Sequence, residues 1–395
     1  MSRIIWVHKE VFDKSLDRTT WVEMATALRR RGYGVHMVCA YAEHPVPLPA
    51  FDDVTWLPLS GPGLLRRLRF QAKSWSTVQR LVLRERPELV ILDEWTSMSS
   101  FPMDFATRIG LGKTKFVMDM RTIQFGVTDN RLALHDRAVR LQTRVALLYD
   151  RAAHHGLTVI VPALGEIVRT FGARRRIGVW GSGIAASTSD LHSTPPASSP
   201  ALDAWRRSAY RMIYHGGLGH NRGLSTAVRA IEVCRDRGFE TPVLLLLGDG
   251  PNSSALRGQA RELGLESQCI VHPSIPYEQV APLIAEADLG IMDYPDLRYW
   301  DANHPIKLME YLGAGVPVIC SDTPVFRNID PSGDVLIYVQ PDSPEALADK
   351  ITECVAGDEN LNTRVQLGYG IAADNTWDRQ AERLLSYVGL PARSG

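Results

Sequence analysis

The chain has 395 residues, of which 45% are apolar and 22% charged, and its formal net charge at pH 7 is zero. This composition is typical of a soluble globular protein, and the length is sufficient for two domains with separate cores. No run approaches the roughly 20 apolar residues of a membrane-spanning helix. The five cysteines are far apart and form no CxxC pair, so neither a disulfide framework nor a zinc site is predicted. Because the N-terminus lacks the apolar core of a signal peptide, we expect a cytoplasmic protein.

The zero net charge conceals a difference between the two halves of the chain. Residues 1–186 hold 27 Lys and Arg against 17 Asp and Glu, so their net charge is +10, and residues 187–395 balance it with −10. A basic half can face an anionic partner such as a membrane surface or a phosphorylated lipid. The alternative is an uneven but solvated surface.

The first half alternates between strand and helix patterns. Residues 4–7 are a short apolar strand, residues 21–31 are an amphipathic helix that ends at Gly32, and residues 35–40 resume as a strand. This order is a βαβ unit. It predicts an α/β domain with a parallel sheet.

A basic segment follows at residues 64–86. Its arginines include Arg66, Arg67 and Arg69, and apolar residues such as Trp75 lie between the basic ones. A basic amphipathic helix with aromatic residues can lie in a bilayer interface. It can equally be a crossover helix that packs its apolar face on the sheet. No nucleic-acid-binding motif accompanies the charge, so nucleic acid is not an expected partner.

Polar side chains follow the next two predicted strands. The strand at residues 89–92 ends in Asp93 and Glu94, and the strand at 116–118 is followed by Asp119 and Arg121. Ligands bind at the carboxyl ends of strands in open α/β sheets, so these residues are site candidates. The alternative is an internal Asp–Arg ion pair that supports the loop.

Residues 187–204 are rich in Ser, Pro and small side chains and are predicted to be a linker. A second α/β unit follows it. Its first strand leads into a turn with Gly217 and Gly219, and Arg222 occupies the last position of a GxGxxG pattern, which argues against a dinucleotide fingerprint. A glycine-rich turn that carries an arginine into a helix start suits a diphosphate. The alternative is a plain loop arginine.

The most informative stretch covers residues 302–320. Pro305 suits the first turn of a helix, glycines end that helix, and a buried strand follows. Lys307 and Glu310 are three apart and share one face near the helix start. A cation there can hold a diphosphate, and a carboxylate one turn further along can accept hydrogen bonds from a pair of sugar hydroxyl groups. The alternative is an exposed ion pair between the two residues.

Pro-Ile-Lys-Leu-Met-Glu-Tyr at residues 305–311, with Gly-Val-Pro-Val at 315–318, resembles the signature of GT-B glycosyltransferases of family 4, the group 1 type. Gly-Asp-Gly-Pro at residues 248–251 resembles a second element of that family. The resemblance implies an α/β protein of GT-B fold, with two Rossmann-like domains facing a cleft. It divides the chain into an acceptor domain at 1–186, the linker, a donor domain at 205–371 and a returning C-terminal helix at 372–395.

The resemblance also implies an activity. The protein would be a hexosyl- or related glycosyltransferase that moves a sugar from a nucleotide-diphosphate sugar to an acceptor hydroxyl, with retention and without metal or cofactor. The acceptor would be a lipid-linked glycan or a polysaccharide, and the basic half could place the protein at the inner face of a membrane. The alternative is a GT-B protein that binds a nucleotide sugar without catalysis.

Residue roles are transferred by matching positions to the family motifs. The expected catalytic residues are Asp119, Arg121, Arg222 and Lys307. The expected donor-binding residues are Gly217, Gly219, Arg222, Gly248, Ser274, Ile275, Asn303, His304, Pro305, Ile306, Lys307, Leu308 and Glu310. The residues expected to meet the acceptor or a membrane are His8, Arg66, Arg67 and Arg69.

One position departs from the family pattern. The usual motif has a second Glu eight residues before Glu310, where this chain has Ala302. That Glu contacts the transferred sugar in the family. Asp301 or Asn303 could substitute for it, so the donor sugar stays open.

Overall fold

The computed structural model describes residues 2–12, 18–41, 48–59, 63–122, 133–174, 176–184, 197–239, 242–297, 300–357 and 360–393. The chain divides into two compact units. Unit 1 comprises Met1–Gly183, Ala302–His304 and Trp377–Gly395, and unit 2 comprises Ile184–Asp301 and Pro305–Thr376. Two segments from late in the sequence therefore belong to the first unit.

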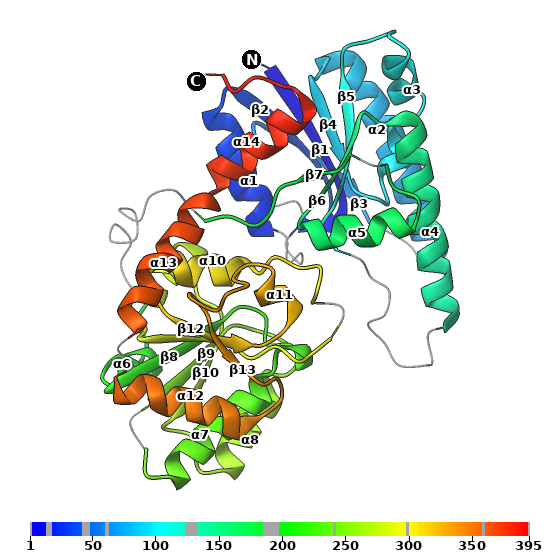
Figure 1. Cartoon of the computed structure of the whole chain (residues 1–395). Coiled ribbons are helices and arrows are strands. Elements are labelled where there is room, and N and C mark those ends of the chain that lie inside the picture. The colour runs from blue at the N-terminus through cyan, green and yellow to red at the C-terminus, as the bar shows by residue number, and fades with distance from the viewer. Residues whose placement is uncertain are drawn as a thin grey trace. The chain divides into compact units, whose positions relative to one another are not determined.

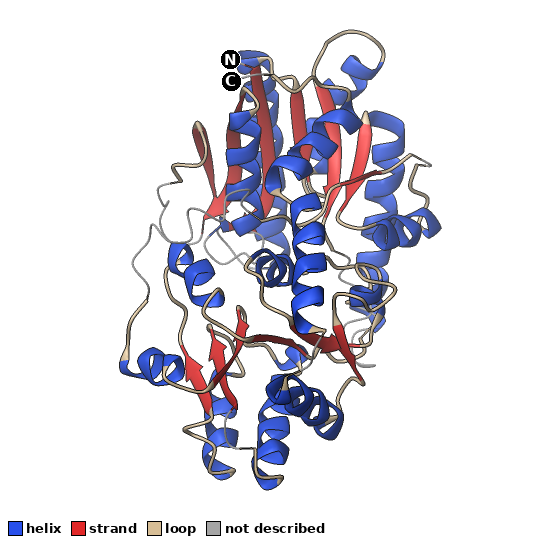
Figure 2. Ribbon diagram, turned by 60° about the vertical axis from the view of Figure 1, so that its left-hand side comes forward, coloured by secondary structure: helices blue, strands red, loops and turns tan. Residues whose placement is uncertain are grey.

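Unit 1 is built on a parallel sheet with helices on both faces (Figures 1 and 2). Among the described residues the sheet has seven strands in the order β3-β2-β1-β4-β5-β6-β7. The strands are β1 (Ser2–Val11), β2 (Tyr33–Tyr41), β3 (Asp53–Pro58), β4 (Leu89–Leu92), β5 (Lys115–Met120), β6 (Gly156–Val159) and β7 (Gly178–Val179). The helices are α1 (Arg18–Arg30), α2 (Gly63–Glu85), η2 (Ser97–Ser100), α3 (Met103–Arg108), α4 (Ala133–Ala153), α5 (Pro162–Thr170) and α14 (Trp377–Val388).

Side chains along β1 alternate between the two faces of this sheet, and both faces are buried. Ile4 and Trp6 join a core cluster with residues of α1 and α14, whereas Ile5 and Val7 join another with residues of α2. Successive side chains of a strand point to opposite faces, so a continuous apolar run marks a strand buried on both sides.

The packing of α2 decides in part between the two alternatives for the basic segment, a crossover helix or a helix in a bilayer interface. Its residues Phe70, Val78 and Leu81 are buried against the sheet, as in a crossover helix. These side chains are therefore not available to enter a bilayer. Leu68 and Trp75 of the same helix are exposed.

Unit 2 contains a second parallel sheet. Its described strands number six, in the order β10-β9-β8-β11-β12-β13. They are β8 (Tyr210–His215), β9 (Pro242–Leu247), β10 (Cys269–His272), β11 (Leu289–Met292), β12 (Val318–Ser321) and β13 (Ile337–Val339). The helices are α6 (Pro200–Arg206), η5 (His220–Arg222), α7 (Leu224–Asp236), α8 (Ser253–Glu262), η6 (Tyr277–Gln279), α9 (Val280–Ile284), α10 (Ile306–Gly313), α11 (Pro324–Arg327), α12 (Pro344–Ala356) and α13 (Leu361–Asp374).

Helix α6 begins inside the segment that the composition marks as a linker. Ser199 caps it by accepting a hydrogen bond from the backbone N–H of Leu202. Leu202 and Trp205 are buried in the core of unit 2, and the Trp205 indole donates to the carbonyl of Met212 at 3.0 Å. Apolar burial thus extends unit 2 to residue 200. Residues 187–196 of the predicted linker lie outside the described residues.

The C-terminal helix α14 packs on unit 1, against α1. Trp377, Ala381 and Leu384 are buried in the same cluster as Trp21. The Tyr387 hydroxyl accepts a hydrogen bond from the backbone N–H of Leu157 at 3.1 Å. None of the described helices combines the length and apolarity that crossing a membrane requires.

Candidate functional site

The sheet of unit 2 has a topological switch point between β8 and β11. From β8 the chain proceeds outward through β9 and β10, and then returns to place β11 on the other side of β8. Loops at the carboxyl ends of these two strands diverge, which leaves room for a ligand in an open α/β sheet. Arg222 follows β8 and Tyr294 follows β11, so both side chains come from this point.

Glycines let the loops at this edge approach one another backbone to backbone. Gly248 has φ +142°, and a Cβ there would lie 2.0 Å from the carbonyl oxygen of Gly216. Gly223 has φ +68°, and a Cβ there would lie 1.4 Å from the carbonyl oxygen of Asp293. Both positions require glycine for conformation and for space. The turn after β8 is therefore held firmly against the neighbouring loops.

Lys307 lies against this glycine turn. A Cβ on Gly216 would be only 3.1 Å from the Lys307 ammonium nitrogen. That nitrogen is 5.0 Å from the centre of the Tyr214 ring and 3.4 Å from the Tyr294 hydroxyl. The first turn of α10 thus directs its cation at the switch point.

Arg222 reaches the same tyrosine from the other side of the turn. Its Nη1 donates a hydrogen bond to the Tyr294 hydroxyl at 3.1 Å, and its guanidinium lies 4.3 Å from the centre of the Trp300 ring. Burial alone would raise the pKa of Tyr294, but the charges of Lys307 and Arg222 outweigh burial and lower that pKa. Two cations converge on one hydroxyl, and this arrangement favours an anionic ligand.

Glu310 pairs with a histidine. Its Oε2 lies 2.7 Å from Nε2 of His215, and Nδ1 of that ring lies 3.0 Å from the Tyr311 hydroxyl. The alternative of an exposed ion pair between Lys307 and Glu310 is therefore wrong, because each side chain is engaged elsewhere. The Glu310 carboxylate lies at the carboxyl end of β8, where it can accept hydrogen bonds from the hydroxyl groups of a ligand.

Ser274, Ile275 and Leu308 are further predicted donor-binding residues of unit 2. Asp249 accepts hydrogen bonds from the hydroxyl and the backbone N–H of Ser274, and these bonds lower the pKa of Asp249. Ile275 is partly buried and packs on the core. Leu308 is fully buried, so only its backbone can meet a ligand.

A buried carboxyl group lies beside the turn. Burial raises the pKa of Asp293 to about 7, although a hydrogen bond from the Ser321 hydroxyl at 2.9 Å opposes the shift. Within the described residues, its second oxygen has no hydrogen-bond partner.

The residues just before α10 belong to unit 1. The backbone N–H of Ser182 donates to Nδ1 of His304 at 3.2 Å, and the Ser182 hydroxyl donates to the His304 carbonyl at 2.7 Å. Burial, followed by the charges of Arg121 and Arg383, lowers the pKa of His304 to about 4. Asn303 and His304 are thus grouped with unit 1, whereas Pro305, Ile306 and the residues after them belong to unit 2.

Ala302 has a structural reason to be small and apolar. It is only 8% exposed and lies in a core cluster of unit 1 that also contains Met118, Met120 and Leu157. A glutamate at this position would bury a carboxylate among apolar side chains. The departure from the family motif is therefore consistent with local packing.

Unit 1 has a corresponding switch point between β1 and β4. His8 packs against Trp21 with ring centres 4.3 Å apart and the ring planes tilted by 52°, and its Nε2 lies 3.7 Å from the Asp93 carboxylate. Its Nδ1 accepts a hydrogen bond from the backbone N–H of Glu10 at 3.2 Å. Burial raises the pKa of the adjacent Glu94 to about 7. His8 and Asp93 are thus paired at the switch point of this unit, and Glu94 is the next residue along the chain.

Asp119 and Arg121 are buried at the end of β5. Oδ1 of Asp119 accepts a hydrogen bond from the Thr158 hydroxyl at 2.6 Å. Arg121 donates to the carbonyl of Trp180 at 2.9 Å and stacks over that ring at 3.9 Å. The predicted catalytic residues thus divide between the units, with Arg222 and Lys307 in unit 2.

The arginines expected at an acceptor or membrane lie at the start of α2. Arg66 and Arg69 are exposed, and the side chain of Arg67 lies outside the described residues. Among the described residues, no group of three or more His, Cys, Asp or Glu is arranged to hold a metal ion.

Sequence reasoning missed the aromatic and histidine partners of the site. Tyr214, His215 and Tyr294 were not predicted, although each stands at the carboxyl end of β8 or just after β11. Their position at the strand ends could have predicted them as site residues, because the carboxyl ends of β8 and β11 meet at the switch point.

Comparison with known proteins shows which family and which folds the chain resembles. Residues 204–371 match the family model described as glycosyl transferases group 1. Over 195 residues the chain is 31% identical to a protein of Bacillus subtilis (strain 168) named "Putative teichuronic acid biosynthesis glycosyltransferase TuaH". The match covers 48% of this chain and 48% of that protein, so the chain spans about half the length of this curated relative.

Solved structures resemble the chain over nearly its whole length. Sucrose-phosphate synthase of Thermosynechococcus elongatus has a TM-score of 0.72 at 15% identity, with 98% of each chain covered. A glycosyltransferase from Rickettsia africae ESF-5 has a TM-score of 0.70 at 13% identity, with 98% of this chain and 97% of that chain covered. HepE of Anabaena, solved with UDP and glucose, has a TM-score of 0.69 at 16% identity, covering 98% of this chain and all, 100%, of that one.

The predicted α/β fold of GT-B type, with two Rossmann-like sheets, is confirmed by these structures and by the two parallel sheets described above. Residues 204–371 form a domain of the family of glycosyl transferases group 1, and the resemblance recognised from the sequence is thereby confirmed.

Proposed function

We propose that the protein is a glycosyltransferase that moves a sugar from a nucleotide-diphosphate sugar to an acceptor hydroxyl. The observation that carries the proposal is the convergence of Lys307 and Arg222 on Tyr294, against a glycine turn, inside a domain that matches the family model. A diphosphate is the anion that this geometry suits, because two cations and the first turn of α10 would face it. HepE of Anabaena has been solved with UDP-glucose, which supports a nucleotide-sugar donor.

In the proposed reaction the bond between the anomeric carbon and the diphosphate oxygen breaks. The acceptor oxygen forms the new bond to that carbon, and the acceptor's proton leaves with the diphosphate. Lys307 and Arg222 would stabilise the negative charge that develops on the departing diphosphate. The Glu310 carboxylate, which lies 2.7 Å from Nε2 of His215, would accept hydrogen bonds from hydroxyl groups of the nucleoside. Retention at the anomeric carbon and independence of metal are part of the proposal and rest on the family resemblance.

The acceptor would be a polysaccharide or a lipid-linked glycan. The assignment of the Bacillus relative to teichuronic acid biosynthesis supports a glycan acceptor. Unit 1 would bind it, with His8 and Glu94 at the switch point and Asp119 and Arg121 at the end of β5. The site of action would be the cytoplasm, at the inner face of a membrane.

The test is a thermal-shift screen of UDP, GDP, ADP and TDP on the wild type, Lys307→Ala and Glu310→Ala. We expect one nucleotide to stabilise the wild type, by about 2.7 kcal/mol at a hundredfold excess over its Kd, and this gain to disappear in both variants. Lys350→Ala is the matched control, because Lys350 is an exposed helical lysine paired with Glu353. If no nucleotide stabilises the wild type, donor binding is excluded.

A second measurement separates catalysis from binding alone. A transferase hydrolyses its donor slowly when acceptor is absent, whereas a protein that only binds the donor leaves it intact. We expect slow release of free sugar from the donor whose nucleotide stabilises the wild type, and none from Lys307→Ala. Binding without any release would favour the non-catalytic alternative.

A further inference from the structure

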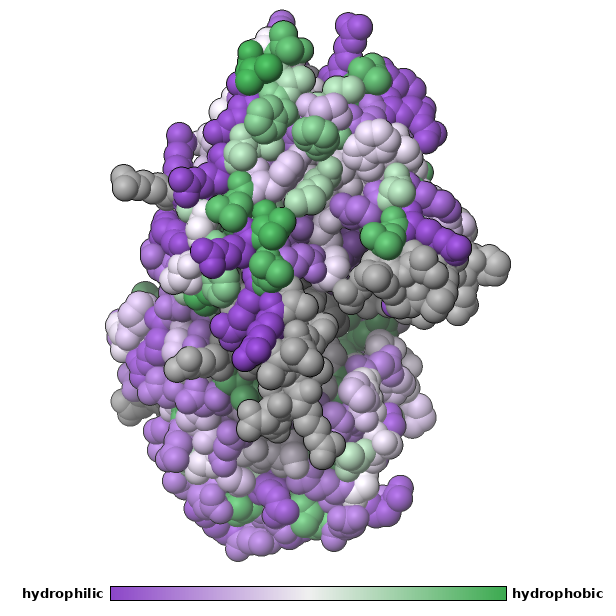
Figure 3. Space-filling view, turned by 90° about the vertical axis from the view of Figure 1, so that its right-hand side faces the viewer, coloured by the Kyte–Doolittle hydropathy of each residue, from purple (hydrophilic) through white to green (hydrophobic). Residues whose placement is uncertain are grey.

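Unit 1 exposes a group of large apolar side chains on neighbouring elements. Leu111 is 77% exposed, Ile109 67% and Leu141 64%. We define the docking surface by Trp75 of α2 together with the exposed apolar residues of η2, α3, α4 and the adjoining loops, namely Met98, Phe101, Phe105, Ile109, Leu111, Leu141, Val145 and Leu148. Figure 3 shows hydrophobic residues gathered among hydrophilic ones over this unit. A contiguous exposed apolar patch marks an interaction site.

Hydrogen bonds hold these elements together as one surface. The Trp75 indole donates to the carbonyl of Phe101 at 2.6 Å, which fixes α2 to the loop after η2. Gln79 donates to the carbonyl of Ser99 at 2.9 Å. The Tyr149 hydroxyl donates to the Asp104 carboxylate at 2.6 Å and joins α4 to α3.

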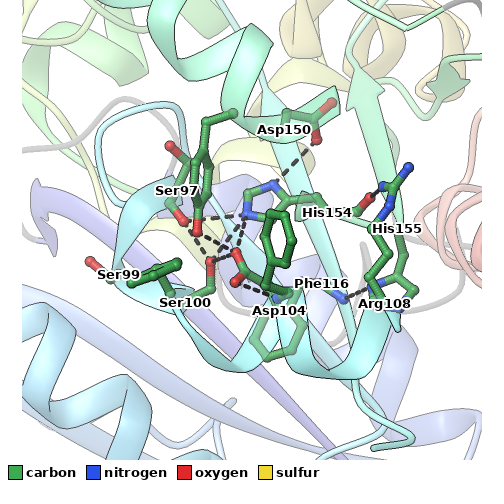
Figure 4. Close-up of polar contacts among 12 residues, drawn as sticks. Ser97, Ser99, Ser100, Asp104, Arg108, Phe116, Asp150, His154 and His155 are labelled. Carbon is green, nitrogen blue, oxygen red and sulfur yellow. Dashed lines mark hydrogen bonds and ion pairs between the residues drawn. The ribbon is translucent and has the colours of Figure 1, made fainter. Parts of the chain in front are cut away.

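The described carboxylates of α2, α3 and α4 are withdrawn from the surface. Figure 4 shows the buried network in which His154 lies between Asp150 and Asp104, with Ser100 beside it. The His154 ring nitrogens are 3.2 Å from Asp150 and 3.4 Å from Asp104, and all three side chains are fully buried. Glu85 is also nearly buried, at 7% exposure, and pairs with His36.

The exposed charge that remains is positive. Among described side chains of α2, α3, α4 and the loop after α3, the exposed ionisable residues are Arg66, Arg69, Lys73, Arg80, Arg84, Arg108, Lys113, Arg137, Arg140, Arg144 and Arg151. Apolar and aromatic side chains thus lie among arginines and lysines, and none of the described carboxylates of these helices is exposed. This is the composition of surfaces that lie in the interface of an anionic bilayer.

We infer that this docking surface binds an anionic lipid membrane. The apolar side chains would enter the boundary of the acyl chains, and the basic ones would lie at the headgroups. A second copy of the chain is the less suitable occupant, since a symmetric contact would bring the same basic residues of both copies together. The inference does not depend on the donor site of unit 2, so either can fail without the other.

The test uses the full chain and flotation with vesicles. One set contains phosphatidylglycerol and phosphatidylcholine in equal parts, and the other contains phosphatidylcholine alone. We expect binding to the first set and not to the second. Ile109→Ser with Leu111→Ser, and separately Arg137→Ser with Arg144→Ser and Arg151→Ser, should each weaken binding at least tenfold. For the arginine variant we expect about a hundredfold loss, since each basic residue contributes about 1 kcal/mol near an anionic surface.

Matched controls lie in unit 2. Phe239→Ser replaces another exposed apolar residue, and Arg229→Ser with Arg257→Ser replaces exposed arginines. These variants should bind vesicles as the wild type does. All variants should unfold at the same temperature as the wild type, because every substituted side chain is exposed.

A dye can report the orientation of the bound protein. The five native cysteines are buried, so an exposed cysteine introduced by Ile109→Cys can be labelled selectively. An environment-sensitive dye at this position should gain fluorescence with anionic vesicles, and the same dye at Phe239→Cys should not. The inference is overturned by equal vesicle binding of wild type and surface variants, or by no binding. It is also overturned by a dimer of the wild type that the Ile109 and Leu111 substitutions abolish.

Discussion

Gly217 is a position where the fold does not need a glycine, whereas the proposed ligand would. A Cβ added there meets no atom within 4 Å, and its backbone lies outside the left-handed region. The protein itself therefore does not require glycine at this position. A diphosphate held by the turn after β8 would require it, since the backbone must approach the phosphates closely.

We therefore predict that Gly217→Ala leaves the melting temperature within a degree or two of wild type but abolishes the stabilisation by nucleotide. The measurement is thermal unfolding with and without the nucleotide selected by the screen. Gly258→Ala is the control, because a Cβ there also meets nothing within 4 Å. Undiminished nucleotide stabilisation of Gly217→Ala would remove this turn from the donor site.

Sequence reasoning at the scale of residues worked where the signal is local. Lys307 and Glu310 lie on one helical turn, so their shared face follows from spacing alone. Their partners could not be predicted in this way. Glu310 contacts His215, and Lys307 contacts Tyr294, because β8 and β11 are neighbours in the sheet. The last residues of these strands, His215 and Met292, are 77 positions apart in the chain.

At the scale of elements, the buried network around His154 joins η2, α3 and α4. Burial would lower the pKa of His154, but hydrogen bonds and charges from Asp104 and Asp150 outweigh burial and raise it. Arg174 also faces Asp150, with Nε 2.8 Å from that carboxylate. A histidine whose folded pKa is raised contributes stability that is complete below its unfolded pKa near 6.5 and is lost as pH rises through the folded pKa.

We predict that His154→Leu destabilises unit 1 by about 3–5 kcal/mol at pH 6, because it leaves the buried Asp104 carboxylate without a cation and Asp150 with Arg174 alone. The difference in unfolding free energy from wild type should shrink as the pH rises through the raised folded pKa of His154, because the wild-type imidazole loses its charge there. Urea unfolding of both proteins over a pH series from 6 upward measures this difference. Glu166→Ala, which removes an exposed ion pair with Arg169, should cost less than about 1 kcal/mol throughout the series. A difference that is constant across the series would contradict a charged His154.

The basic helix α2 illustrates how far a pattern of one element can be interpreted. Its sequence allowed either packing on the sheet or contact with a membrane. In the structure Phe70, Val78 and Leu81 pack on the sheet. Trp75 instead joins exposed residues of η2, α3 and α4, which no pattern within α2 could predict.

At the scale of the whole molecule, the last helix stabilises the unit that begins the chain. Trp377 is 1% exposed and lies in a cluster with Trp21 and Leu28. We predict that Trp377→Ala lowers the unfolding free energy of unit 1 by about 3–5 kcal/mol and leaves unit 2 unchanged. Thermal unfolding with the selected nucleotide separates the two transitions, because the nucleotide should raise only that of unit 2.

Leu367→Ala is the control for this variant, since Leu367 of α13 is 46% exposed. Its cost should stay within about 1 kcal/mol. If Trp377→Ala instead lowers the transition that the nucleotide raises, then α14 stabilises unit 2, and the division of the chain at residue 377 is wrong.

The sequence by itself determined the fold class and the two cations of the candidate donor site. Apolar runs, helical periodicity and glycines at turns are local signals, and the Lys307 motif lies within one helix and its flanks. Only the tertiary structure decided which distant residues meet. It placed Tyr294 between Lys307 and Arg222, and it placed residues 302–304 and α14 in unit 1. It also buried Asp104 of α3 and Asp150 of α4 beneath a basic surface. The reason is physical, since strand order and burial arise from packing between segments far apart in the chain, which no local pattern encodes.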